Sequence, residues 1–169
     1  MKTKILIGID MGSSSLKALA LDAGSGRSLA VSRLPLRHAR LPGGGCEVGA
    51  AAIRAGLTHV LGDVARQLGP RATGVCAIGC TGLGPGLFAL DRHNELVGGR
   101  AVASTDQRAD ARALALSARH GDRLFADVGC RPWPGQPTVI AAGLLGADAV
   151  QRGGLHRPLF AKDYLRLLL

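Results

Sequence analysis

A strand-turn-strand segment at the start of the chain constrains the fold more than any other feature. Residues 4–10 read K-I-L-I-G-I-D and are apolar at both odd and even positions, as in a strand buried on both faces of a sheet. A Gly/Ser turn over residues 11–15 follows, and residues 16–22 are again strand-like. After a second turn, residues 28–34 predict a third strand. Strands joined by such tight turns predict an antiparallel meander, because a βαβ unit needs room for crossover helices.

The rest of the chain alternates between helical and strand-like segments. Residues 50–68 place apolar side chains at steps of three and four, which predicts an amphipathic helix that stops at Gly69 and Pro70. Further strands are expected at residues 73–79, 87–90 and 100–104, and further helices at residues 106–119, 138–149 and 162–169. Residues 35–49 and 131–137 are expected to be irregular loops. This order of elements predicts an α/β domain.

The turn between the first two strands has the composition of a phosphate site. Asp10 ends the strand, and Gly12 and three serines follow it. Glycine lets the backbone approach an anion closely, and successive amides in such a turn form an anion-binding concavity to which hydroxyls add donors. A carboxylate here can hold Mg²⁺, which neutralises phosphate charge. The alternative is a plain hairpin whose Asp and Ser side chains satisfy the turn. The predicted site consists of Asp10 for the metal and of Gly12, Ser13, Ser14, Ser15 and Lys17 for phosphate.

The net charge of +9 raises the question of a nucleic-acid partner. The arginines are scattered singly along the chain, and only 3% of the residues are aromatic, so a base-stacking platform is poorly supplied. We therefore expect no nucleic-acid partner. The alternative, a basic RNA- or DNA-binding domain, would be revealed by a salt-dependent shift assay.

Hydropathy and cysteine usage point to the cytoplasm. No apolar run reaches the ~18 residues that a membrane span requires. The short apolar run at residues 5–9 leads into Asp10 without a small-residue cleavage site, so we expect neither a signal peptide nor a membrane partner. The four cysteines form no C-x-x-C pair and no zinc set; they are Cys46, Cys76, Cys80 and Cys130. Cys76 and Cys80 are expected to be small buried hydrophobic residues with reduced thiols.

Four segments together resemble one protein family. Residues 7–17, I-G-I-D-M-G-S-S-S-L-K, resemble the first phosphate motif of the actin/hexokinase ATPase superfamily. Within that superfamily, the closest resemblance is to the FGGY carbohydrate kinases. Residues 78–91 resemble their strand, sugar-binding corner and next strand, residues 101–109 their segment ending in Asp-x-Arg, and residues 162–166 their K-D-Y-L-R helix. Glu47 more faintly resembles a Glu before the first helix. The resemblance implies a ribonuclease-H-like N-terminal lobe with a mixed sheet flanked by helices.

The resemblance also implies an activity. The intact enzyme would use ATP and Mg²⁺ to phosphorylate a sugar hydroxyl, a reaction that depends mainly on positioning and electrostatics. Asp10 would hold Mg²⁺, and Gly12 to Ser14 would line the phosphate path. The residues implied to bind the sugar are Gly82, Leu83, Gly84, Pro85, Ser104 and Asp106. Asp106 would accept hydrogen bonds from sugar hydroxyls; its alternative role is to cap the next helix together with Thr105.

Two departures from the family pattern affect the sugar. Many members carry larger polar side chains in the corner where this chain has Leu83, Gly84 and Pro85, and Ser104 stands where a Trp is usual. The Ser-Thr-Asp version resembles the xylulokinase and L-xylulose kinase branch, which acts on pentuloses, or enzymes that act on erythritol. The corner itself leaves the identity of the sugar open.

The resemblance places the remaining machinery beyond Leu169. In the family, the catalytic base, the second phosphate motif and the adenosine site all follow the K-D-Y-L-R helix. We therefore expect residues 1–169 to form an N-terminal domain that is incomplete at its C-terminal end, with no catalytic base and no activity of its own. Exposed apolar surface around residues 165–169 should favour a homodimer or other self-association. The alternative is a non-catalytic module that binds a sugar or an anion.

Overall fold

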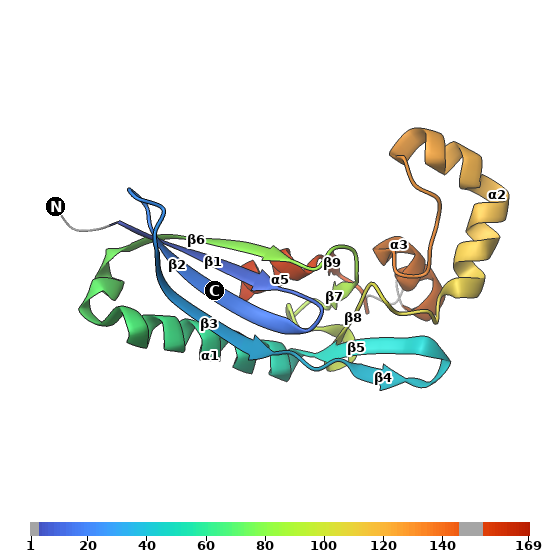
Figure 1. Cartoon of the computed structure of the whole chain (residues 1–169). Helices are drawn as coiled ribbons and strands as arrows, with labels where there is room; N and C mark the ends of the chain where they lie inside the picture. Colours follow the sequence, from blue (N-terminus) through green and yellow to red (C-terminus); the bar gives the residue numbers. More distant parts are fainter. Residues whose placement is uncertain (1–3, 146–153) are drawn as a thin grey trace. The chain divides into compact units, whose positions relative to one another are not determined.

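Residues 4–145 and 154–169 are described by the computed structural model of the chain (Figure 1). They divide into two units. The first unit contains the residues up to Arg37, Ala51–Leu83 and Ala161–Leu169, and the second contains His38–Ala50 and the described part of Gly84–Phe160. Each unit has its own sheet and its own buried residues.

The first unit is built on a mixed four-stranded sheet in the order β3-β2-β1-β6 (Figure 1). Its strands are β1 (Ile5–Met11), β2 (Ser15–Asp22), β3 (Ser28–Pro35) and β6 (Val75–Gly82). The first three strands are antiparallel and β6 pairs with β1 in parallel. The meander and the mixed sheet predicted from the sequence are thus confirmed. The 3₁₀-helical segment η2 (Gly69–Gly74) precedes β6, where the sequence pattern had placed the first strand residues.

Helix α1 (Ala50–Leu68) has the bounds predicted for it and covers one face of this sheet (Figure 1). Its buried side chains include Ile53, Leu57 and Val60, which follow the predicted steps of three and four. Gly56 lies in the contact, because a Cβ there would meet Leu16 at 3.4 Å. Helix α5 (Ala161–Leu168) packs against β6 and β1, with Tyr164 and Leu165 buried.

The opposite face of the sheet is open over β1 and β6, which corrects the expectation of a strand buried on both faces. β1 buries Ile5, Ile7, Ile9 and Met11 on one face, whereas Leu6 on the other is 39% exposed. β6 is an edge strand of this sheet. Its Ile78 pairs with Ile7, on the face that β1 buries, and is still 44% exposed. For the same reason the expected burial of Cys76 is wrong, and Cys80 is only half-buried. Burial raises the pKa of the Cys80 thiol.

The second unit contains two small antiparallel sheets. β4 (Ala39–Leu41), β5 (Gly45–Gly49) and β8 (Arg100–Val102) form one in the order β4-β5-β8. β7 (Phe88–Leu90) and β9 (Arg157–Leu159) form the other. The 3₁₀-helical segments are η1 (Pro42–Gly44) and η3 (Val97–Gly99).

The prediction of an irregular loop at residues 35–49 is therefore wrong, because most of these residues form the β4–β5 hairpin. The hairpin turns at Gly43 and Gly44, whose φ angles of 69° and 78° suit glycine. Strands of three and five residues carry too little periodicity to be read from the sequence.

The helices of the second unit differ from the predicted ranges. Helix α2 (Asp110–Val128) begins and ends later than the predicted 106–119, and it stops at Gly129 with φ 73°. Helix α3 (Pro137–Ile140) continues into a π-helical turn, η4 (Ala141–Leu145), and residues 146–149 of the predicted helix lie outside the described residues. Ile140 packs with Leu87 and Ala89, and Val139 packs with Ala109 and Ala113. Within the described residues no helix is long and apolar enough to span a bilayer.

Candidate functional site

The predicted phosphate turn is a tight hairpin between β1 and β2. The Gly12 N–H donates to the Ser15 carbonyl at 2.9 Å and closes the turn. Ser13 and Ser14 at its tip are exposed, and their amides donate to no acceptor in the part of the chain that the structure describes. Ser15 differs, since only 2% of it is exposed. The tip of the hairpin therefore presents two free amides and two hydroxyls.

Asp10 stands beside this turn, between residues of both neighbouring strands. It pairs with Lys17 across the antiparallel β1–β2 ladder and with Thr81 across the parallel β1–β6 ladder. The Lys17 Nζ lies 3.4 Å from the Asp10 Oδ2, and both side chains are nearly half exposed. An open cavity of about 470 Å³ adjoins them; its lining residues are Gly8, Ile9, Asp10, Lys17, Leu19, Gly79, Cys80 and Thr81.

Six of these eight cavity residues were not predicted from the sequence, and Gly8, Gly79 and Thr81 are the most informative of them. Gly8 and Gly79 are direct partners in the β1–β6 ladder, and a Cβ at either would meet nothing within 4 Å. They make a floor of bare backbone next to Asp10, and Thr81 adds a hydroxyl. Glycine inside a strand is a signal for close approach by another group, and it could have identified Gly8. Gly79 carries the same signal in its own strand, but which strand lies beside β1 is set by the long-range pairing, so the sequence could not place Gly79 and Thr81 beside Gly8.

The donor set at Asp10 fits a phosphate-bound magnesium ion better than a metal site made wholly of protein. Among the described residues, no group of three or more His, Cys, Asp or Glu side chains could hold a metal. Mg²⁺ usually binds one or two carboxylates and completes its shell with waters and substrate phosphates. One half-exposed carboxylate beside an open turn meets that requirement.

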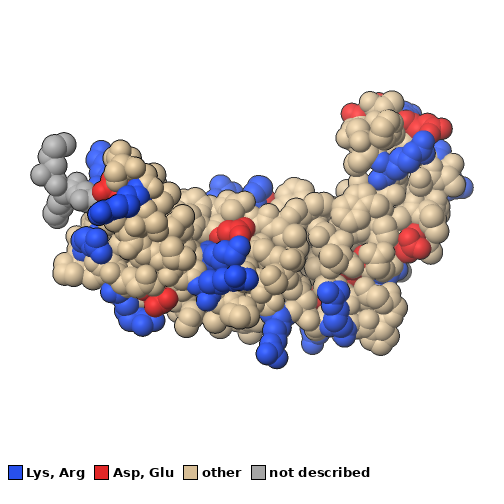
Figure 2. All heavy atoms as spheres, in the orientation of Figure 1, with Lys and Arg blue, Asp and Glu red and all other residues tan. Residues whose placement is uncertain are grey.

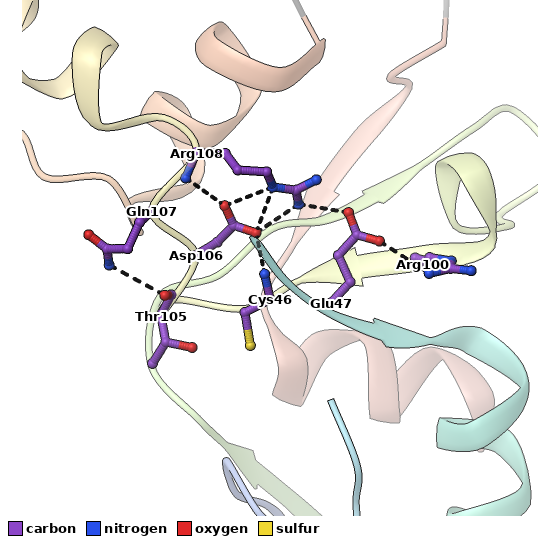
Figure 3. Close-up of polar contacts among 7 residues, drawn as sticks. All are labelled: Cys46, Glu47, Arg100, Thr105, Asp106, Gln107 and Arg108. Atoms are coloured by element: carbon purple, nitrogen blue, oxygen red, sulfur yellow. Dashed lines mark hydrogen bonds and ion pairs between the residues drawn. The ribbon is translucent and has the colours of Figure 1, made fainter. Parts of the chain in front are cut away.

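Asp106, predicted to bind the sugar, lies at the centre of a hydrogen-bonded network in the second unit (Figure 3). Only 1% of it is exposed. Its Oδ2 accepts the Cys46 N–H at 2.7 Å, and its Oδ1 accepts the Arg108 N–H at 2.9 Å. The Arg108 guanidinium adds bonds of 2.7 and 3.1 Å to the same carboxylate. Both oxygens are thus engaged by protein donors, and the predicted contact with a sugar stays a prediction.

The alternative role of Asp106 as a helix cap is not observed either. The residue before α2 is Ala109, and no side chain caps that helix. Asp106 and Gln107 are held instead by backbone bonds to Ala103 and Gly44, at 3.0 and 3.1 Å. These bonds divert residues 106–109 from the helix, which explains its late start.

Arg108 links Asp106 to a second carboxylate. Its Nη2 lies 2.7 Å from the Glu47 Oε1, and Arg100 lies 3.6 Å from the other oxygen of Glu47. Burial alone would raise the pKa of Asp106, but the Arg108 side chain and the Cys46 and Arg108 amides outweigh it and hold that pKa below its ordinary value. The Asp106 and Glu47 carboxylates in turn raise the pKa of Arg108. The network fixes β5 to the segment before α2.

The predicted sugar corner is divided between the two units. Gly82 and Leu83 belong to the first unit, and a Cβ on Gly82 would meet Ala161 at 2.9 Å. Gly84 and Pro85 belong to the second unit with Ser104, and a Cβ on Gly84 would meet nothing within 4 Å. The neighbouring Gly86 approaches the Ser104 backbone, because a Cβ there would lie 3.2 Å from the Ser104 nitrogen. The second unit thus brings the end of the corner against Ser104.

The basic side chains show no single patch on the face drawn in Figure 2. Lys and Arg stand there in separate groups, some of them next to Asp or Glu.

The family model for the N-terminal domain of the FGGY family of carbohydrate kinases matches residues 5–169. The chain belongs to this family, as the resemblance of residues 7–17, 78–91, 101–109 and 162–166 had suggested. No curated protein has a sequence that matches it significantly.

Solved structures of this family share the fold of the chain. A "xyloylose kinase" from Brucella ovis has a TM-score of 0.87 at 22% identity, over 96% of this chain and 34% of that one. A xylulose kinase from Rhodospirillum rubrum has a TM-score of 0.86 at 20% identity, over 98% of this chain and 34% of that one. A glycerol kinase from Plasmodium falciparum, solved with ADP, has a TM-score of 0.73 at 16% identity, over 90% of this chain and 31% of that one. The chain spans about a third of the length of these kinases.

Proposed function

We propose that the chain is the N-terminal lobe of a kinase that transfers the γ-phosphoryl group of ATP to a hydroxyl of a pentulose or a related polyol. The observation that carries this proposal is the β1–β2 hairpin, where Asp10 and Lys17 flank an open cavity and the tip amides are free. Family membership and the xylulose kinases among the similar structures support the class of substrate.

The hairpin supplies the phosphate-binding part of this function. The Ser13 and Ser14 amides and hydroxyls would donate to phosphate oxygens, while the Ser15 carbonyl keeps the turn closed through Gly12. Lys17 would add a positive charge, and Asp10 would hold the Mg²⁺ that accompanies ATP, which lowers the charge of the phosphates as they react. The glycine floor at Gly8 and Gly79 leaves room for these groups.

The second unit supplies part of the sugar site. Ser104, with Gly84 and Pro85 of the corner, would face the sugar, while Asp106 fixes the segment that carries Ser104 through its bonds to Cys46 and Arg108. In the complete enzyme we expect the catalytic base and the adenosine pocket to lie beyond Leu169. Gly82 and Leu83 would form the first part of the sugar corner, where β6 ends.

Amide chemical shifts of the chain test the phosphate site directly. Inorganic phosphate, and then Mg·ATP, should shift the Ser13 and Ser14 amide resonances in a saturable way. The turn at Gly24 and Ser25 is the matched control, because it has a similar composition but its amides already donate to Asp22 at 2.8 and 2.9 Å. Its resonances should not move. Equal shifts at both turns, or none at Ser13 and Ser14, would refute the proposed phosphate site.

A further inference from the structure

The only tryptophan of the chain lies against the segment proposed to bind the sugar. A Cβ placed on Gly135 would stand 1.9 Å from the Ser104 carbonyl oxygen and 2.2 Å from Cζ3 of Trp133. Because both atoms lie this close to the same position, the edge of the indole ring is in contact with the Ser104 carbonyl. Only glycine at position 135 permits this contact.

The loop that carries Trp133 is closed on itself. The Gln136 N–H donates to the Trp133 carbonyl at 3.2 Å, and the Gln136 side chain accepts the Trp133 N–H at 3.3 Å. The other end of that side chain donates to the Cys130 sulfur at 3.1 Å. Pro132 and Pro134 flank Trp133 and restrict the backbone on both sides of it. The backbone that carries the indole is therefore restricted.

Trp133 is half-buried, so part of its indole ring stays accessible to a ligand. The segment that it contacts carries the partly exposed Ser104, followed by the exposed Thr105. Figure 3 shows the Thr105 side chain pointing away from the Asp106 carboxylate, so it is not part of that network. Small-molecule sites typically combine an apolar or aromatic surface with a few polar groups, and an indole ring beside hydroxyls and a carbonyl has this composition.

We propose that Trp133 is a specificity-determining residue, whose indole face packs against the carbon skeleton of the sugar while Ser104 and Thr105 bind its hydroxyls. The ligand class is a five-carbon ketose or a short polyol, which has an apolar C–H face and a polar edge. This inference rests on the proposed function, because it assumes that the Ser104 segment faces the sugar.

Calorimetric titration of the 169-residue chain with D-xylulose, L-xylulose, D-ribulose and erythritol tests this role. For the sugar that binds, Trp133→Ala should raise Kd about tenfold, because a well-placed aromatic contact is worth about that factor. Trp133→Phe should recover most of the affinity. Phe125→Ala is the matched control, an exposed aromatic residue on α2 of the same unit, and it should leave Kd unchanged.

The outcomes separate the two proposals. Unchanged sugar affinity in a folded Trp133→Ala variant would overturn the role of Trp133 and leave the proposed function standing. If none of the four compounds binds the wild-type chain, the sugar-binding role proposed for the second unit fails and the inference fails with it, while the phosphate site of the hairpin is tested separately by the amide shifts. Should Trp133→Ala not fold, the fluorescence of the single tryptophan in the wild-type chain decides. Saturating sugar should protect the indole from acrylamide quenching, and an unprotected indole would contradict the proposal.

Discussion

The buried carboxylate of Asp106 shows how much a residue's role depends on its surroundings. The D-x-R pattern and its place in the chain were visible in the sequence, and so was the presence of Glu47 upstream. That Arg108 turns back onto Asp106 and also reaches Glu47 could not be read from the sequence, because it depends on the β5–β8 pairing. A carboxylate whose two oxygens both accept hydrogen bonds from the protein stabilises the segment that carries it. The contribution of Asp106 to the free energy of unfolding can therefore be measured.

We expect Asp106→Ala to destabilise the chain by about 3 kcal/mol, because it leaves Arg108 and the Cys46 amide without their main acceptor. The effect should depend on pH. Since the pKa of Asp106 is lowered from 3.8, the stability it contributes is present above that value and is lost as the pH falls through the lower folded-state pKa. The gap in melting temperature between wild type and Asp106→Asn should therefore shrink below about pH 4. A gap that stays constant between pH 7 and pH 3 would contradict this role.

Two glycines of the sugar corner should respond in opposite ways to substitution. At Gly86 a Cβ would lie 3.0 Å from the Val102 carbonyl oxygen, which belongs to backbone and cannot easily move, so Gly86→Ala should cost about 1–3 kcal/mol. Gly84 has open space around it, so Gly84→Gln should leave the melting temperature unchanged and alter the sugar preference of the complete enzyme. Thermal unfolding of both variants checks the stability. A large loss for Gly84→Gln would mean that its backbone is constrained.

At the scale of elements, a long helix with a strong apolar periodicity could be predicted from the sequence, whereas short paired strands could not. Helix α1 was predicted to the residue because its apolar steps continue until Gly69 and Pro70 stop it. The β4–β5 hairpin and β9 were missed, because strands this short exist through their partners and not through their own pattern. The edge position of β6 likewise follows from the sheet order, and it explains why an apolar strand exposes Cys76 and Ile78.

Helix α1 offers a prediction at this scale. Gly62 lies on its exposed side, where a Cβ would meet nothing within 4 Å. Gly62→Ala should stabilise the first unit by about 0.5–1 kcal/mol, because alanine favours the helix and restricts the unfolded chain. Gly56→Leu is the counterpart, and it should destabilise because Leu16 and Leu34 already occupy that contact. Chemical denaturation measures both. Destabilisation by Gly62→Ala would show that this side of α1 is covered by another part of the protein.

At the scale of the whole molecule, the exposed apolar residues of the first unit bear on assembly. The expected apolar surface at residues 165–169 is present in part, since Leu165 is buried but Leu167 and Leu169 are 41% and 54% exposed. The edge strand β6 adds Ile78, and no other strand of the described residues pairs with its outer side. A sheet edge of this kind pairs readily with another copy.

We therefore predict that the isolated chain self-associates as its concentration rises, and that Ile78→Lys increases the monomer fraction by placing a charge on the edge strand. Phe125→Lys on α2 is the control for added charge alone and should have a smaller effect. Sedimentation velocity over a concentration series distinguishes the three proteins. A wild-type chain that remains monomeric throughout would refute the prediction.

Sugar-dependent release of ADP tests the central claim most directly. The assay compares the 169-residue chain with the protein extended in frame beyond Leu169, each with Mg·ATP and the pentulose and polyol panel. The extended protein should release ADP only with sugar, and Asp10→Ala should slow it about 100-fold, which corresponds to about 2.7 kcal/mol of lost transition-state stabilisation. The 169-residue chain should show no turnover. Turnover by this chain alone would place a catalytic base within it, and undiminished turnover in Asp10→Ala would remove the hairpin from the mechanism.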